Sequence, residues 1–101
     1  MSTVYVIQEV PGRNLTSLFD WGTPKVCLAA NAQVALVSAP VVRKLRDQLK
    51  HYTDGDWLVP IGDPAAIGIA CAIAAHNNQG RFALLKWDRL ERRYYAVQVS
   101  I

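Results

Sequence analysis

Four side chains of the types that bind transition metals or act as nucleophiles occur in the chain, namely Cys27, His51, Cys71 and His76. Structural zinc sites usually bring their ligands in pairs about two to five residues apart. Cys71 and His76 come nearest to such a pair, but on a helix they would lie about 140° apart around the axis. The sequence therefore predicts no metal site.

Both cysteines lie within apolar runs, Cys27 between Val26 and Leu28 and Cys71 among alanines and isoleucines. A reactive thiolate needs an electropositive and partly exposed setting, whereas an unpaired cysteine commonly packs as a small hydrophobic residue. Gly-x-Ser-x-Gly and other known catalytic motifs are absent from the sequence. We therefore expect both cysteines in the core, no cofactor, and a protein that is not an enzyme.

Acid–base chemistry is the third enzymatic alternative, because His51, Asp54, Asp56 and Asp63 lie within 13 positions. An enzyme would need a pocket around His51 and Asp56. Turn and capping roles are favoured for these residues. Asp54 and Asp56 belong to a turn with Gly55, and Asp63 precedes Pro64 at a helix start.

The most suggestive feature is a basic, aromatic segment at 81–95, expected to form a β-hairpin. Its basic residues are interleaved with Trp87, Tyr94 and Tyr95, and such aromatic rings can stack on unpaired bases. A second basic segment lies on the helix expected at 39–52. The candidate residues for binding nucleic acid or a partner are Arg43, Lys44, Arg46, Lys50, Lys86, Arg89, Arg92, Arg93 and Tyr94. The alternative is structural, with aromatics covering the core and arginines protecting an exposed edge.

The elements that must position these residues follow from periodicity and turn signals. β-Branched and aromatic runs predict strands at 3–10, 25–30, 33–38, 57–61, 81–88 and 94–99. An apolar stripe of Val42, Leu45, Leu49 and Tyr52 indicates the helix at 39–52. The second helix is expected from Pro64 to about Asn77. Leu15, Leu18, Phe19 and Trp21 lie in a connection expected to be pinned to the core.

This order predicts an α+β fold, with a small mixed or antiparallel sheet, two helices packed on one face and a C-terminal β-hairpin. The 101 residues are 51% hydrophobic and carry a net charge of +3, which fits a single α+β domain over 1–101 in a small basic protein. The apolar stretch at 57–75 is interrupted by Pro60, Asp63 and Pro64, so no membrane span is expected. With no signal peptide visible at Met1, we expect a cytoplasmic protein with no membrane partner.

The helix segment 64–75 is apolar all round, with small residues that permit close approach. Some of its surface could therefore line a homodimer interface. The leading hypothesis is a small non-enzymatic protein that acts by binding another protein or itself. The alternative is a nucleic-acid-binding module that uses the basic hairpin and the basic helix.

Overall fold

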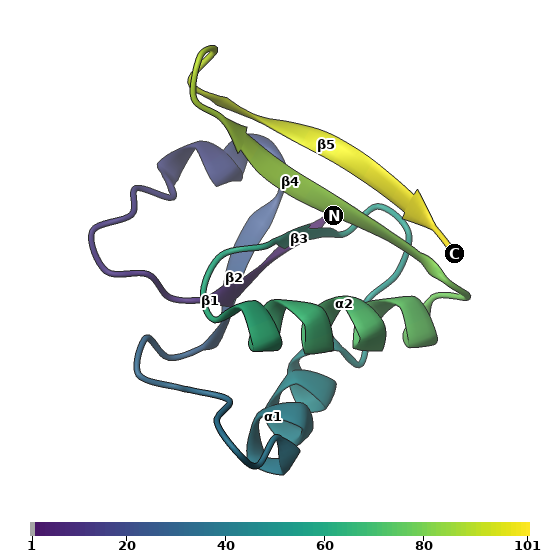
Figure 1. Ribbon diagram of the computed structural model, residues 1–101. Helices are drawn as coiled ribbons and strands as arrows, with labels where there is room; N and C mark the ends of the chain where they lie inside the picture. Colours follow the sequence, from purple (N-terminus) through teal and green to yellow (C-terminus); the bar gives the residue numbers. More distant parts are fainter. Residues whose placement is uncertain (1) are drawn as a thin grey trace.

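The computed structural model describes residues 2–101 and shows a five-stranded mixed sheet with two helices on one face (Figure 1). The elements in chain order are β1 (Thr3–Gln8), the 3-10 helix η1 (Thr16–Asp20), β2 (Thr23–Leu28), α1 (Ala39–Leu49), β3 (Trp57–Val59), α2 (Pro64–Asn77), β4 (Arg81–Asp88) and β5 (Arg93–Ser100). The strand order is β2-β1-β3-β4-β5; β1 to β4 are parallel, and β5 is antiparallel to β4. The predicted α+β class and C-terminal hairpin are confirmed.

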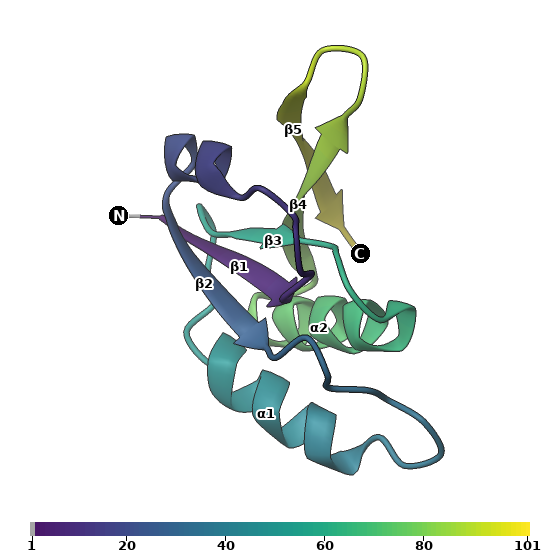
Figure 2. The ribbon, with the colours of Figure 1, turned by 90° about the vertical axis from the view of Figure 1, so that its left-hand side faces the viewer.

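The larger core lies between the sheet and the two helices. Parallel neighbours require crossover connections, and α1 and α2 supply those that lead into β3 and β4. Both helices cover the same face (Figure 2). Ile7 and Leu58 meet Leu45 and Leu49 of α1 there, all fully buried. Alanines of α2, Ala66, Ala70 and Ala74, are also buried in this core.

A smaller core lies on the opposite face, here called the η1 face. Val6 and Val59 point to this side and are covered by Leu18 of η1. Trp21 packs edge-on against Trp57 at a ring-centroid distance of 5.1 Å. The connection after β1 is thus pinned to the sheet as expected, although Phe19 is 69% exposed.

The predicted strand at 33–38 is wrong, because this segment is a loop between β2 and α1. Its apolar residues Leu36 and Val37 face solvent rather than a core. The Val34 amide, which a strand would pair in a sheet, donates instead to Asp63. A short apolar run does not by itself distinguish a strand from other structure.

Two smaller predictions also need correction. The strand expected at 57–61 ends at Val59, before Pro60, and lies at the centre of the sheet. The α1 stripe includes Val41, which is buried, whereas Val42 is half-buried.

The buried amide of Gln8 joins the end of β1 to the loop after β2 and to the start of α2. Its Nε2 donates to the Ala29 and Ala32 carbonyls at 3.0 and 2.6 Å. Its Oε1 accepts from the Asp63 amide at 2.7 Å. The Asp63 carboxylate in turn accepts from Ala65 and Val34, which lowers the pKa of that carboxyl and confirms its capping role.

Gly62 allows this junction to close, so Gly62→Ala is expected to be strongly destabilising. Gly62 has φ +116°, and an added Cβ would overlap the Gln8 side chain. We expect a loss of about 2–5 kcal/mol in the free energy of unfolding, from backbone strain plus overpacking. Gly12→Ala is the control: φ is +80° but the space is open, so the loss should be about 1–2 kcal/mol. Equal losses in urea unfolding would contradict this account.

Tyr52 makes the stability of the fold sensitive to alkali. Its hydroxyl accepts from the Ala83 amide at 2.9 Å and donates to the Asp56 carbonyl at 3.2 Å. Burial raises the pKa of Tyr52 from 10.0 to about 12. Above the lower value the unfolded chain loses the phenolic proton while the folded chain keeps it. The contribution of Tyr52 to stability is therefore complete below about pH 10 and lost between about pH 10 and 12.

Tyr52→Phe should lower the free energy of unfolding by about 1–3 kcal/mol at neutral pH, because the Ala83 amide loses its partner. The variant should also show a shallower fall in stability between about pH 10 and 12. Urea unfolding at neutral and alkaline pH measures both effects. An unchanged alkaline slope would show that Tyr52 does not cause it.

Candidate nucleic-acid interface

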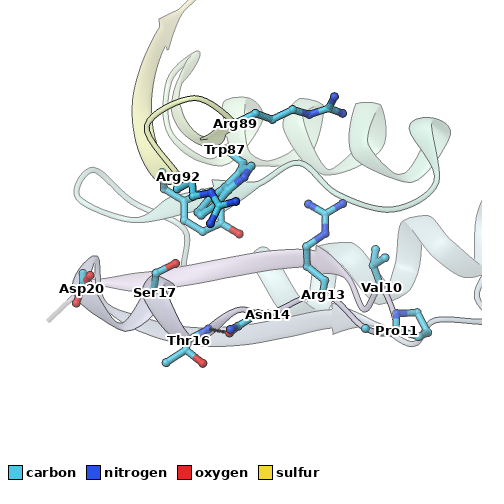
Figure 3. A pocket seen from close by; sticks show the side chains of 12 residues that line it. Val10, Pro11, Arg13, Asn14, Thr16, Ser17, Asp20, Trp87, Arg89 and Arg92 are labelled. Carbon is cyan, nitrogen blue, oxygen red and sulfur yellow. Dashed lines mark hydrogen bonds between the residues drawn. The ribbon is translucent and has the colours of Figure 1, made fainter.

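A cavity of about 1040 Å³ opens on the η1 face between the loop after β1 and the tip of the β4–β5 hairpin (Figure 3). We call it the basic cleft. It is lined by Val10, Pro11, Gly12, Arg13, Asn14, Thr16, Ser17, Asp20, Trp87, Arg89, Arg92 and Tyr94. The two walls are far apart in sequence, and the strand order brings them together.

The hairpin supplies the aromatic wall of the basic cleft. Trp87 and Tyr94 are cross-strand partners, so their side chains share a face, and the rings meet edge-on at 4.9 Å. Tyr94 is buried, whereas Trp87 remains 43% exposed. Tyr94 therefore packs against Trp87 and restrains it, and the exposed part of Trp87 lines the cleft.

The hairpin turn supplies two of the arginines. Asp88 Oδ1 accepts from the Leu90 and Glu91 amides at 2.9 and 3.2 Å, which fixes the start of the turn. Arg92 closes it in the left-handed conformation, with φ 54°. The turn places Arg89 and Arg92 beside Trp87 at the cleft.

The third arginine comes from the opposite wall. After Pro11-Gly12 the Arg13 amide donates to the Val10 carbonyl at 3.2 Å, and Asn14 Oδ1 accepts from Thr16 at the start of η1. The Arg13 side chain extends from its loop toward the hairpin (Figure 3). Its charge reaches Tyr94: burial raises the pKa of Tyr94, and Arg13 partly opposes that rise.

The basic cleft is positive, since three arginines and one carboxylate, Asp20, line it. The ion pairs among residues 2–101 join Lys50 to Asp47 and Arg81 to Asp54. None of the cleft arginines takes part in them, so their guanidinium groups are available to an anionic ligand.

The structure brings together Arg89, Arg92 and Tyr94 from the predicted set and places the other members elsewhere. Lys86 pairs with Tyr95, and Arg93 pairs with Asp88. Because side chains alternate along a strand, these two pairs lie on the opposite face from the Trp87–Tyr94 pair, which is the helix side of the hairpin. The Lys86 ammonium lies 5.9 Å from the Tyr95 ring.

The α1 residues of that set, Arg43, Lys44, Arg46 and Lys50, are exposed on the far side of the sheet from the basic cleft. Arg46 and Lys50 line a separate cavity of about 510 Å³ together with His76 and Asn77 of α2. The two basic segments therefore do not form one continuous surface.

Arg13 and the η1 residues of the cleft were missed by sequence reasoning. Residues 1–40 carry no net charge, and nothing local marks Arg13. The only signal was the Pro11-Gly12 turn, which shows that the chain reverses but not what it approaches. The strand order was needed to place this loop beside the hairpin.

The residues considered for catalysis and metal binding differ in their hydrogen bonds and their burial. The carboxylate of buried Asp56 accepts from the Thr3 and Thr53 amides, while His51 is exposed. Burial raises the pKa of the Cys27 thiol to about 11, so it stays protonated at neutral pH. No three His, Cys, Asp or Glu side chains within 2–101 are grouped to hold a metal ion. No helix in that range is long and apolar enough to cross a membrane.

The helix proposed for self-association is partly covered within the chain, because Ala66, Ala70, Ile73 and Ala74 are buried. α2 packs against α1 and the sheet, and its buried residues belong to the helix-side core. Its exposed positions up to residue 75 include Ala65, Gly68 and Ala72. A homodimer through 64–75 stays a prediction.

Residues 2–101 match the family model described as Phage Pam3 gp32-like protein, and the chain belongs to this family. No curated protein and no solved structure matches the chain. The family description names a phage protein and no activity, so the function must be argued from the cleft.

Arg92 and its neighbour Arg93 should respond oppositely to glycine. Arg92→Gly removes left-handed strain and should raise the free energy of unfolding by about 1 kcal/mol. Arg93→Gly falls in β5 and should lower it by about 0.5–1 kcal/mol. Thermal or urea unfolding tests this, and a loss of stability for Arg92→Gly would contradict the assigned turn.

Proposed function

We propose that this member of the Phage Pam3 gp32-like family is a non-enzymatic binding protein that holds single-stranded nucleic acid in the basic cleft. The observation that supports the proposal is that Arg13, Arg89 and Arg92 line one cleft together with Trp87, which is 43% exposed. A single-stranded nucleic acid uses both features, because its phosphates can bind the arginines and an unpaired base can stack on Trp87.

The charge and the hydrogen-bond donors of the cleft both favour a polyanion. Guanidinium groups bind phosphate oxygens through paired hydrogen bonds, and the cleft arginines have no carboxylate partner among residues 2–101. The Ser17 and Thr16 hydroxyls and the Asn14 amide line the same cavity and add donors for phosphate or sugar oxygens.

Trp87 favours a single strand over a duplex. In a duplex each base face is already stacked, whereas an unpaired base can lie on an aromatic side chain. Trp87 is 43% exposed and is held in place by buried Tyr94. Because base faces and phosphates carry little sequence information, we expect weak sequence preference.

The test is fluorescence anisotropy with a fluorescein-labelled oligothymidylate and its RNA counterpart. Three phosphate contacts predict that affinity falls about 20-fold between about 50 and 200 mM salt. The cleft variant Arg13→Ala, Arg89→Ala, Arg92→Gly should bind more than about tenfold more weakly at low salt.

A matched control removes the same charge from the far face. It combines Arg43→Ala, Lys44→Ala and Arg46→Ala. This α1 variant should retain affinity within about threefold. Equal losses in both variants, or no binding even at low salt, would overturn the proposal.

Trp87 distinguishes nucleic acid from an acidic peptide, which would use the same arginines. Trp87→Ala should weaken oligonucleotide binding about 5- to 100-fold, while Trp87→Phe, which keeps a stacking face, should lose much less. Polyglutamate is the competing ligand. Tighter binding of polyglutamate than of oligothymidylate at equal charge would replace nucleic acid with an acidic protein partner.

A further inference from the structure

The two edges of the sheet are protected very differently. β2 forms one edge and contains Pro24 and Lys25, and a proline or a lysine on an edge strand hinders further pairing. β5 forms the other edge, and from Tyr94 to Ser100 it has no charge, proline or glycine. All eight of its residues pair with β4 in one continuous register, so no bulge twists the edge away. β5 is therefore an edge that can accept another strand.

The hydrogen-bond phase of the hairpin shows which β5 groups face outward. The Ile101 amide donates to the Gly80 carbonyl at 2.8 Å, so these residues form a hydrogen-bonded pair in the β4–β5 ladder. Alternate residues of an antiparallel pair make these bonds. Residues 93, 95, 97 and 99 therefore turn their amides toward β4. Tyr94, Ala96, Gln98 and Ser100 turn theirs toward the free edge.

We propose that the β5 edge binds the β5 edge of a second copy of this chain, antiparallel about a twofold axis at Val97, to form a ten-stranded sheet. A twofold axis normal to the sheet leaves the helix faces of both copies on one side of the joined sheet. Opposed residues must therefore both have odd numbers or both have even numbers, because side chains alternate between the two faces along a strand. With Val97 opposite Val97, Ala96 faces Gln98 and Tyr94 faces Ser100, and these pairs carry the outward amides.

The side chains favour a second copy as the occupant and favour this register. On the helix face, Tyr95 lies opposite Val99 and Val97 opposite itself, which gives a continuous row of apolar cross-strand pairs. Tyr95 is 40% exposed in the single chain, and Val97 is half-buried. Between residues 94 and 100 no charged side chain opposes another. Moving the twofold axis to Ala96 would instead place Arg93 opposite Val99.

The first experiment is light scattering on the full chain, without nucleic acid, over a range of concentrations. We expect a mass of twice 11.2 kDa at high concentration. Val97→Lys places like charges opposite each other at the axis and should raise the dimer dissociation constant more than about tenfold. Val97→Thr is the matched control and should stay dimeric. Circular dichroism and thermal unfolding show that each variant is folded.

A cysteine at the axis tests the register directly. Val97 would lie in a non-hydrogen-bonded pair with a Cα–Cα distance of about 4.5 Å, which a disulfide can span. Val97→Cys should cross-link under mild oxidation. Val99→Cys should not, because its copies would lie about 13 Å apart. The unaltered chain controls for Cys27 and Cys71, which are buried and half-buried.

A monomer at every concentration would overturn the proposal. So would a dimer that Val97→Lys leaves intact and that Val97→Cys does not cross-link, which would move the interface to another surface such as α2. Because no oligonucleotide is present, these outcomes are independent of the outcome at the basic cleft.

Discussion

The amide of Gln8 is the constraint on which the arrangement of the sheet depends. Open α/β sheets commonly bind ligands at the carboxyl ends of two adjacent strands whose following connections leave in opposite directions along the sheet. Here those two strands are β1 and β3. Gln8 and Asp63 satisfy the backbone groups there, and Gly62 lets the two chains approach. The usual ligand position is thus used to hold β1, β2 and α2 together, which leaves recognition to other surfaces.

The sheet then divides the charge of the molecule between two faces. α1 and α2 cover one side, so α1 and its exposed basic residues lie on the opposite side of the sheet from the η1 face. The hairpin extends past the end of β3, as Figure 2 shows, and its alternating side chains send Trp87 to one side and Lys86 to the other. A net charge of +3 therefore says little until the strand order assigns each arginine to a face.

The sequence predicts well where one local rule determines the structure. The Asp63 cap and the β4–β5 hairpin depend on neighbouring residues and were placed correctly. The segment 33–38 is a short apolar run of the kind found in buried strands, but its Val34 amide donates to Asp63, far along the chain. The hairpin wall of the cleft could be predicted, because Trp87 and Arg89 are neighbours in one hairpin. Arg13 could not be placed there from the sequence, because only the strand order of the sheet brings its loop beside that hairpin.

The two proposals have a joint geometric consequence. A twofold axis normal to the sheet keeps both η1 faces on one side, so the proposed dimer would present two basic clefts on the same surface, away from the helices. Each cleft offers three arginines and one exposed tryptophan, which by themselves support modest affinity. A nucleic-acid strand long enough to reach both clefts would bind the second intramolecularly, and its affinity would exceed that of a strand confined to one. Dimerisation through β5 would therefore make binding depend on strand length rather than on sequence.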